Sequence, residues 1–245
     1  MILINALRNG LEKFLELLGP GGGPVQVDMR TRIAADFLKG SGVEFGALHS
    51  PLSVPAGVTV KYADFQTIDQ LKLSFPDLPS IRSPDYVTDL ESMSAIGDAS
   101  QDFVIANHVL EHVEDPLKAL GSMARVLRSK GIAYIALPDK RFTFDKDRVL
   151  TPLDHLLRDH REGPDWSLAG HYEEWCRCVD GLSGSEHAQK MGLMLSQRDN
   201  IHFHVWDYPA MMELFSYVTR AETSEFGIEM SALNGSEVIW ILRRK

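Results

Sequence analysis

The sequence predicts an α/β fold in which a doubly wound, mostly parallel sheet ends in a C-terminal antiparallel hairpin. Three observations support this prediction. Short apolar runs alternate with helical stretches between residues 43 and 137, as in the strand–helix–strand units of a parallel sheet. The runs lack polar alternation, which is typical of strands covered on both faces. Asn234-Gly235 separates two later apolar runs, and both residues accept the positive φ of a hairpin turn.

The N-terminal region is expected to be helical and separate from the sheet. Apolar residues recur at helical spacing within residues 1–18, which predicts an amphipathic helix packed on the core. The glycine- and proline-rich run 19–24 ends this helix, and a second helix is expected over 31–39. We therefore divide the chain into an N-terminal helical extension, residues 1–40, and a domain of residues 41–245.

The remaining elements follow in chain order. Strands are predicted at residues 43–45, 58–63, 86–88, 103–106 and 132–137, and helices at 116–127 and 208–218. Residues 139–206 show no clear strand. Because they follow the fifth strand, where an α/β sheet carries loops over its carboxyl edge, we expect a helical insertion that builds a substrate pocket.

Composition and charge exclude several classes of function. The 245 residues are 44% hydrophobic, so the chain can bury a core. The net charge of −9 argues against nucleic acid or anionic membranes as partners, because both require a basic surface. Residues 1–18 are too charged for a signal peptide and too short for a membrane span. Cys176 and Cys178 cannot form a disulfide framework, so a cytoplasmic protein is expected, of undetermined oligomeric state.

Polar residues stand where the predicted parallel strands end, and ligands bind open α/β sheets at that edge. Asp64 closes the second strand and can accept hydrogen bonds from the two hydroxyls of a ribose. Asp89 follows the third strand and can accept an adenine amino group, while the backbone of Leu90 supports the ring. Several such residues on successive strands indicate a nucleoside site.

Residues 102–113, with the sequence DFVIANHVLEHV, resemble the fourth-strand signature of class I S-adenosylmethionine-dependent methyltransferases. Asp115-Pro116 and the stretch 125–138 continue the pattern. The resemblance covers about residues 43–138, is of the methyltransferase type 11 kind, and agrees with the closing hairpin. A looser similarity at 46–52 and 138–145 suggests a subgroup found with glycan and secondary-metabolite pathways.

The resemblance implies a Rossmann-like methyltransferase fold, S-adenosylmethionine as the cofactor and methyl transfer as the activity. It also implies a set of cofactor contacts at the strand ends. These are Glu44, Gly46 and Ala47 after the first strand, Asp64 at the ribose, Asp89 and Leu90 at the adenine, and Asn107 and His108 near the methionyl group.

The loop after the first strand departs from the family pattern. Three spaced glycines usually let the backbone approach the cofactor, but here Gly46 is followed by Ala-Leu-His-Ser-Pro at residues 47–51. Leucine and proline can narrow the methionine pocket. We expect a reshaped loop that still binds the cofactor, because the other strand-end residues are intact. The alternative is a degenerate methyltransferase fold that serves as a non-catalytic binding or scaffold module.

Two histidine patterns raise the question of a metal site. Residues 108–112 read HVLEH, the inverted zinc-protease pattern, but the first histidine falls at a strand end rather than on a helix. His202 and His204 share one face of an extended segment, with no carboxylate at an obvious ligand spacing. We therefore expect no metal, and a pocket or packing role for these side chains.

The acceptor is expected to be a small polar molecule, such as a sugar, a glycan or a secondary metabolite, held under the insertion. Methyl transfer to oxygen is assisted by a base, and histidine suits neutral pH. His171 is the first choice, because it lies among aromatic residues that can stack on a ring, and His112 beside the fourth strand is the second. The aromatic side chains can equally form the insertion's own core.

Overall fold

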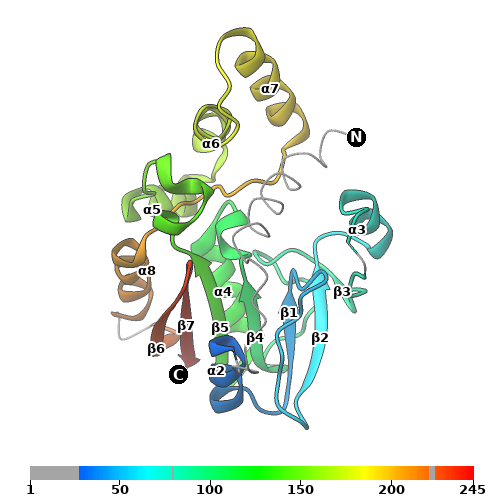
Figure 1. The fold of residues 1–245 in the computed structure, drawn as a ribbon. Coiled ribbons are helices and arrows are strands. Elements are labelled where there is room, and N and C mark those ends of the chain that lie inside the picture. Colours follow the sequence, from blue (N-terminus) through cyan, green and yellow to red (C-terminus); the bar gives the residue numbers. More distant parts are fainter. Residues whose placement is uncertain (1–27, 79, 221–223) are drawn as a thin grey trace.

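The computed structural model describes residues 28–78, 80–220 and 224–245, and Figure 1 shows their arrangement. One seven-stranded sheet has the order β3-β2-β1-β4-β5-β7-β6. Strands β1 to β5 pair in parallel, and β7 pairs antiparallel with both β5 and β6. The predicted α/β class, with a mostly parallel sheet and a C-terminal antiparallel hairpin, is confirmed.

The elements lie close to the predicted positions. The strands are β1 (Ser41–Phe45), β2 (Thr59–Asp64), β3 (Tyr86–Val87), β4 (Gln101–Asn107), β5 (Leu127–Pro138), β6 (Phe226–Asn234) and β7 (Glu237–Arg244). The helices are α2 (Met29–Phe37), α3 (Ile68–Ser74), α4 (Pro116–Val126), α5 (Leu153–Glu162), α6 (Asp165–Cys178), α7 (Gly184–Gln197) and α8 (Tyr208–Arg220). Three 3-10 helices are η1 (Leu110–His112), η2 (Lys140–Phe142) and η3 (Phe144–Asp147). The amphipathic helix predicted for residues 1–18 lies outside the described residues.

Alternate side chains of the central strands point to opposite faces of the sheet, as the pleat of a strand requires. Phe103 and Ile105 of β4 pack with residues of α2 on one face. Val104 and Ala106 pack with residues of α4 and α8 on the other face. Both faces of β4 are therefore buried, which explains why its sequence is an unbroken apolar run.

Two crossovers differ from the predicted alternation of strands and helices. Residues 46–58 between β1 and β2, and residues 88–100 between β3 and β4, contain no helix. Pro51 and Pro55 oppose helix formation in the first of these, because proline lacks the backbone N–H and restricts the residue before it. Conversely, α3 was not predicted, although Thr67 and Gln70 form the capping box that marks its beginning.

The hairpin forms where predicted, but its turn lies one residue later. Asn234 pairs with Glu237, so the loop consists of Gly235 and Ser236. Gly235 has φ +62°, whereas Asn234 is absent from the positive-φ residues of the described chain. The expectation of positive φ at both Asn234 and Gly235 is wrong, because the two-residue loop needs it at the glycine and keeps Asn234 in the strand.

Residues 139–206 are all described, and none of them lies in a strand. Figure 1 shows α5, α6 and α7 stacked beyond one end of the sheet. Tyr172, Trp175 and Phe203 are buried in a core that belongs to this segment, whereas Phe142 and Trp166 are exposed. The aromatic residues therefore serve largely as the segment's own core. The division of the chain at residue 40, with an insertion over 139–206, stays a proposal.

Within the described part of the chain, every helix is too short or too polar to cross a membrane.

Candidate functional site

A pocket of about 560 Å³ opens beyond the carboxyl ends of β1, β2 and β4. The chain winds outward from β1 through β2 to β3 and then returns to place β4 on the other side of β1. The loops after β1 and β4 therefore leave the sheet in opposite directions, and a crevice opens between them. Its volume suits a small-molecule ligand.

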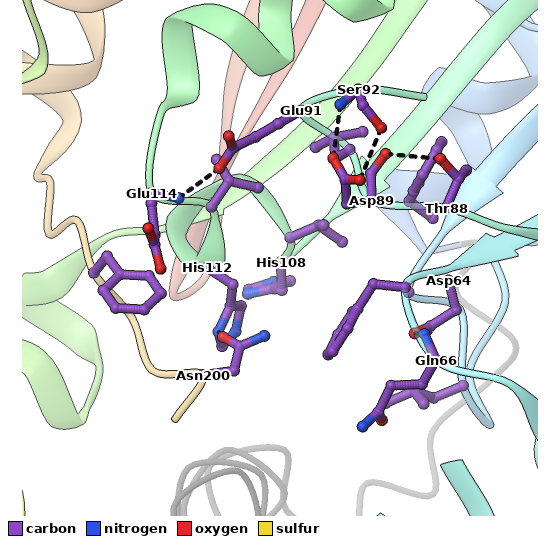
Figure 2. Close-up of a pocket in the computed structure, with 18 of the residues that line it drawn as sticks. Asp64, Gln66, Thr88, Asp89, Glu91, Ser92, His108, His112, Glu114 and Asn200 are labelled. Carbon is purple, nitrogen blue, oxygen red and sulfur yellow. Dashed lines mark hydrogen bonds between the residues drawn. The ribbon is translucent and has the colours of Figure 1, made fainter. Parts of the chain in front are cut away.

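The pocket collects most of the residues that the sequence indicated. Gly46, Asp64, Asp89, Leu90, His108 and His112 line it, whereas Glu44, Ala47, Asn107 and His171 are not among its lining residues. Ala47 is buried in the core, and Asn107 lies at the end of β4. Figure 2 shows Asp64 and Asp89 on one side of the pocket, His112, Asn200 and Glu114 on the other, and His108 between them.

Asp64 is the last residue of β2 and is 8% exposed. Its Oδ1 accepts a hydrogen bond from the backbone N–H of Gln66 at 3.0 Å, which fixes the direction of the carboxylate. Burial raises the pKa of Asp64 to about 6, against the opposing effect of the backbone N–H groups of Phe65 and Gln66. The side chain is thus an ionised acceptor at neutral pH at one side of the pocket.

Asp89 and Leu90 follow β3 and combine an acceptor with an apolar surface. Both carboxylate oxygens of Asp89 accept hydrogen bonds from Ser92, from the backbone N–H at 2.7 Å and from the hydroxyl at 2.8 Å. Leu90 is buried in the core below. Because a carboxylate oxygen can accept more than one hydrogen bond, Asp89 keeps capacity for an amino group at the exposed side.

The loop after β1 is held in an unusual conformation. Gly46 has φ +64°, and a Cβ placed on it would lie 2.9 Å from Val109 Cγ2, so only glycine fits. Leu48 also has positive φ, at 44°, and its carbonyl accepts a hydrogen bond from the backbone N–H of Arg82 at 2.7 Å. Leu48 lines the pocket, whereas Pro51 is not among the lining residues. The side chain of Leu48 therefore occupies part of the pocket that would stay open if this loop carried further glycines.

Glu44 stabilises this loop from below. Its Oε1 accepts a hydrogen bond from the backbone N–H of Leu52 at 2.9 Å. Glu44 is buried, and burial raises its pKa to about 7 despite that hydrogen bond. In this geometry the side chain positions the backbone around Gly46 rather than reaching the pocket itself.

His108 follows β4 with φ +54° and lies between two carboxylates. Its Nε2 is 2.6 Å from Glu237 Oε2, and its Nδ1 is 3.5 Å from Glu111 Oε1. Burial alone would lower the pKa of His108, but hydrogen bonds and charge attraction from Glu111 and Glu237 outweigh burial and raise it to about 9. The pocket therefore contains an imidazolium at neutral pH.

Glu237 was missed by the sequence analysis, although it holds His108. It is the first residue of β7, and it also binds the guanidinium of Arg30 on α2, whose Nε donates to Glu237 Oε1 at 2.7 Å. Burial opposes ionisation of Glu237, but Arg30 and His108 outweigh it and lower its pKa to about 2. No local motif links three elements so far apart in the chain.

His112 lies in η1 and presents a neutral imidazole to the pocket. Its Nδ1 lies 3.0 Å from the carbonyl oxygen of Ile201 and 2.9 Å from Asn200 Oδ1. Because a carbonyl oxygen only accepts, Nδ1 carries the hydrogen and Nε2 keeps its lone pair. Burial, followed by the nearby His202, lowers the pKa of His112 to about 4.

The end of the 139–206 segment closes the pocket opposite Asp64. Arg198, Asn200 and Phe203 line this wall together with Glu114. The guanidinium of Arg198 binds the carboxylate of Glu114 through two hydrogen bonds, of 2.8 and 2.6 Å. Phe203 is one of the aromatic residues expected to stack on an acceptor ring. Glu114, Arg198 and Asn200 were not indicated by the sequence, because their proximity depends on how the segment folds back over η1.

His171 belongs to a different cluster. It lies on α6, and its Nε2 is 3.2 Å from His155 Nε2 on α5. Burial and the neighbouring His155 lower the pKa of His171 to about 4. The structure therefore brings His112 to the large pocket and leaves His171, the first choice for the base, outside it.

Comparison with known proteins finds a family match over part of the chain. Residues 46–135 match a family model described as a methyltransferase domain. No curated protein sequence matches the chain. A solved structure from Rhodobacter sphaeroides, assigned as a Zn-dependent alcohol dehydrogenase, is 14% identical with a TM-score of 0.52, covering 97% of this chain and 98% of that one.

Two further solved structures are methyltransferases. A SAM-dependent methyltransferase from Thermotoga maritima is 12% identical with a TM-score of 0.48, covering 100% of this chain and 99% of that one. The CurJ carbon methyltransferase is 12% identical with a TM-score of 0.44. That alignment covers 96% of this chain and 54% of CurJ, so this chain spans about half of its length.

Proposed function

We propose that the protein is a class I S-adenosylmethionine-dependent methyltransferase that methylates a small polar acceptor, and the match of residues 46–135 to a methyltransferase domain is the premise of this proposal. The observation that carries the proposal is a single pocket with two unlike sides. Asp64 and Asp89 offer hydrogen-bond acceptors on one side, and His112 with Asn200 and Glu114 faces them from the other (Figure 2). The first side suits a nucleoside and the second an acceptor molecule.

The residues present fit the cofactor. Asp64 would accept hydrogen bonds from the ribose hydroxyls, Asp89 would accept one from the adenine amino group, and Leu90 would provide the apolar contact for the ring. Gly46, with no Cβ, lets the backbone after β1 approach the ligand. When bound, S-adenosylmethionine supplies a methyl group on a positively charged sulfur. The chain's part is to hold that group against the acceptor in line for displacement.

We assign the acid–base role to His112 in place of His171. Its Nδ1–H is fixed by the carbonyl of Ile201, so the unprotonated Nε2 can accept the proton that a hydroxyl acceptor loses. As the bound cofactor would give its methyl group to the acceptor oxygen and its sulfur would keep the electron pair of the broken bond, His112 would hold the proton that the hydroxyl loses. Asn200 keeps the imidazole in the required tautomer.

The acceptor is a small hydroxylated molecule such as a sugar, a glycan terminus or a secondary metabolite. The side of the pocket proposed for the acceptor carries charges of both signs, from Glu91, Glu114, Lys118 and Arg198. Phe203 also lines the pocket and offers a ring face. Mixed charge and one aromatic surface favour a compact polar ligand over a polyanion, which would require a broad basic surface.

Calorimetry with S-adenosylmethionine and S-adenosylhomocysteine tests the donor half of the proposal. We expect both to bind with one site per chain. Transfer of a labelled methyl group to a panel of glycans and hydroxylated metabolites then tests the acceptor half. Absence of binding to either ligand at millimolar concentration would instead support the alternative of a non-catalytic binding or scaffold module. Binding without transfer to any member of the panel would contradict the acceptor class alone.

A further inference from the structure

Four side chains with metal-ligating atoms converge outside the large pocket. His155 and Asp159 lie one turn apart on α5, His171 lies on α6, and His204 lies in the extended stretch before α8. One ligand atom from each residue lies within 4.8 Å of the corresponding atom of every other. Asp159 and His204 are each 1% exposed, so two of the four are almost fully buried.

Two of the separations among these atoms match the edge of a small tetrahedron. His155 Nε2 is 3.2 Å from His171 Nε2 and 3.2 Å from Asp159 Oδ2. Zinc binds histidine nitrogen at about 2.0–2.1 Å, so two ligands of a tetrahedral zinc ion are about 3.3 Å apart. The two observed separations agree with that edge.

Hydrogen bonding leaves ligand atoms available within the cluster. His204 Nε2 lies 3.2 Å from the carbonyl oxygen of Glu114, which only accepts, so Nε2 carries the hydrogen and Nδ1 keeps its lone pair. That Nδ1 is buried and has no hydrogen-bond partner among the described residues. A buried lone pair without a partner is costly, and a metal ion would satisfy it.

Asp159 and His155 also have ligand atoms whose hydrogen bonding is incomplete. Asp159 Oδ1 accepts a hydrogen bond from the Ser167 hydroxyl at 3.0 Å, which directs Oδ2 toward the histidines. His155 Nε2 can donate only one hydrogen, yet it faces both His171 Nε2 and Asp159 Oδ2. Hydrogen bonds alone cannot satisfy every contact of this set, whereas one cation can.

We propose that His155, Asp159, His171 and His204 bind a structural zinc ion. Three imidazoles and one carboxylate are ligands that zinc accepts, and four protein ligands close its tetrahedral shell. Asp159 and His204 are almost fully buried, which agrees with a closed rather than a catalytic site. The ion would join α5, α6 and the stretch that carries Asn200 and Phe203 to the large pocket.

This proposal replaces the expectation that the chain holds no metal. The sequence showed two histidines at 202 and 204 without a carboxylate at ligand spacing. The fold separates those two, because His202 turns toward Asp145 and His204 turns toward α5 and α6. The missing carboxylate comes from Asp159, on a helix that no local pattern connects to His204.

Metal analysis of the full-length protein tests the inference without reference to methyl transfer. We expect one equivalent of zinc per chain in the wild type by mass spectrometry, and visible absorption of tetrahedral Co2+ when cobalt replaces it. His171→Ala and Asp159→Asn are expected to lose the metal. His160→Ala is the matched control, because His160 lies on the same helix, faces Asp115 and should keep one equivalent.

Ser167→Ala provides a test that does not depend on removing a ligand. Loss of its hydrogen bond to Asp159 should lower zinc affinity about 10- to 100-fold in a competition titration with a chromophoric chelator. The proposal is overturned if the folded wild type, loaded with zinc or cobalt and desalted, retains neither. It is equally overturned if folded His171→Ala and Asp159→Asn variants bind zinc as tightly as the wild type does.

Discussion

Asp64 is the residue on which the proposed binding of the methyl donor depends most. Its carboxylate is directed by the backbone N–H of Gln66 and stands at the end of β2, where a nucleoside would meet the sheet. We expect Asp64→Ala to weaken binding of S-adenosylhomocysteine by roughly 10- to 100-fold. Loss of hydrogen bonds to a charged group costs about 1.5–3 kcal/mol, and about 1.4 kcal/mol is a tenfold change.

Calorimetry with matched variants measures that loss. Asp69→Ala is the control, because Asp69 is an exposed carboxylate on the nearby α3 and does not line the pocket. If the Asp64→Ala variant and the wild type bound S-adenosylhomocysteine with equal affinity, Asp64 would not contact the ligand. The proposed nucleoside site would then be supported only by the shape of the pocket.

His112 is the corresponding residue on the acceptor side. Once an acceptor is found, we expect His112→Ala to lower kcat by about 10²–10⁴-fold, the usual contribution of a general base. Affinity for S-adenosylhomocysteine should change little, because Asp64 and Asp89, the proposed nucleoside contacts, lie on the other side of the pocket (Figure 2). Turnover with labelled cofactor measures the effect, and His160→Ala serves as the control. Full turnover in His112→Ala would show that another group, or no group, takes the proton.

At the scale of elements, the C-terminal hairpin holds His108 at the pocket through the carboxylate of Glu237. Removing this carboxylate leaves two partly buried cations, His108 and Arg30, without their shared partner. We expect Glu237→Gln to lower the free energy of unfolding by about 1.5–3 kcal/mol at pH 7, the usual contribution of hydrogen bonds to charged groups. Glu229→Gln in the same hairpin breaks the exposed pair with Arg243 and should cost about 1 kcal/mol or less. Denaturant unfolding of both variants makes the comparison.

The same ion pair gives a pH dependence with a definite sign. The pKa of His108 is raised from 6.5 to about 9 in the folded protein, so its stabilising effect is complete below pH 6.5 and is lost as the pH rises toward 9. The wild type should therefore lose stability between pH 7 and 9, and Glu237→Gln should lose less over that range. If the free energy of unfolding changed equally with pH in the two proteins, His108 would not be the cause of this pH dependence.

At the scale of the whole molecule, ligand binding should stabilise the fold against heat. A ligand present at 100 times its Kd adds about 2.7 kcal/mol, which for a chain of this size raises Tm by roughly 5–10 °C. Differential scanning fluorimetry with S-adenosylhomocysteine measures this shift. Asp64→Ala should show a smaller shift at the same ligand concentration. A folded wild type with no shift at millimolar ligand would favour the scaffold alternative.

Local sequence determined the elements and the residues that follow them. The apolar runs predicted every parallel strand, the hairpin dipeptide predicted β6 and β7, and chain order placed Asp64, Asp89 and His108 at strand ends. Each of these inferences depends on residues close together in the chain. The missed helix α3 carried a local signal too, in its capping box.

Only the tertiary structure decided which distant side chains meet. It placed Glu237 against His108, Asn200 against His112, and Asp159 beside His204, and it chose His112 over His171 for the pocket. The physical reason is that strand pairing and packing bring together residues from separate elements, and this proximity leaves no periodic pattern in the sequence. The sequence thus determined the strand edge at which the pocket opens, and the fold determined the partners that set the charges of its side chains.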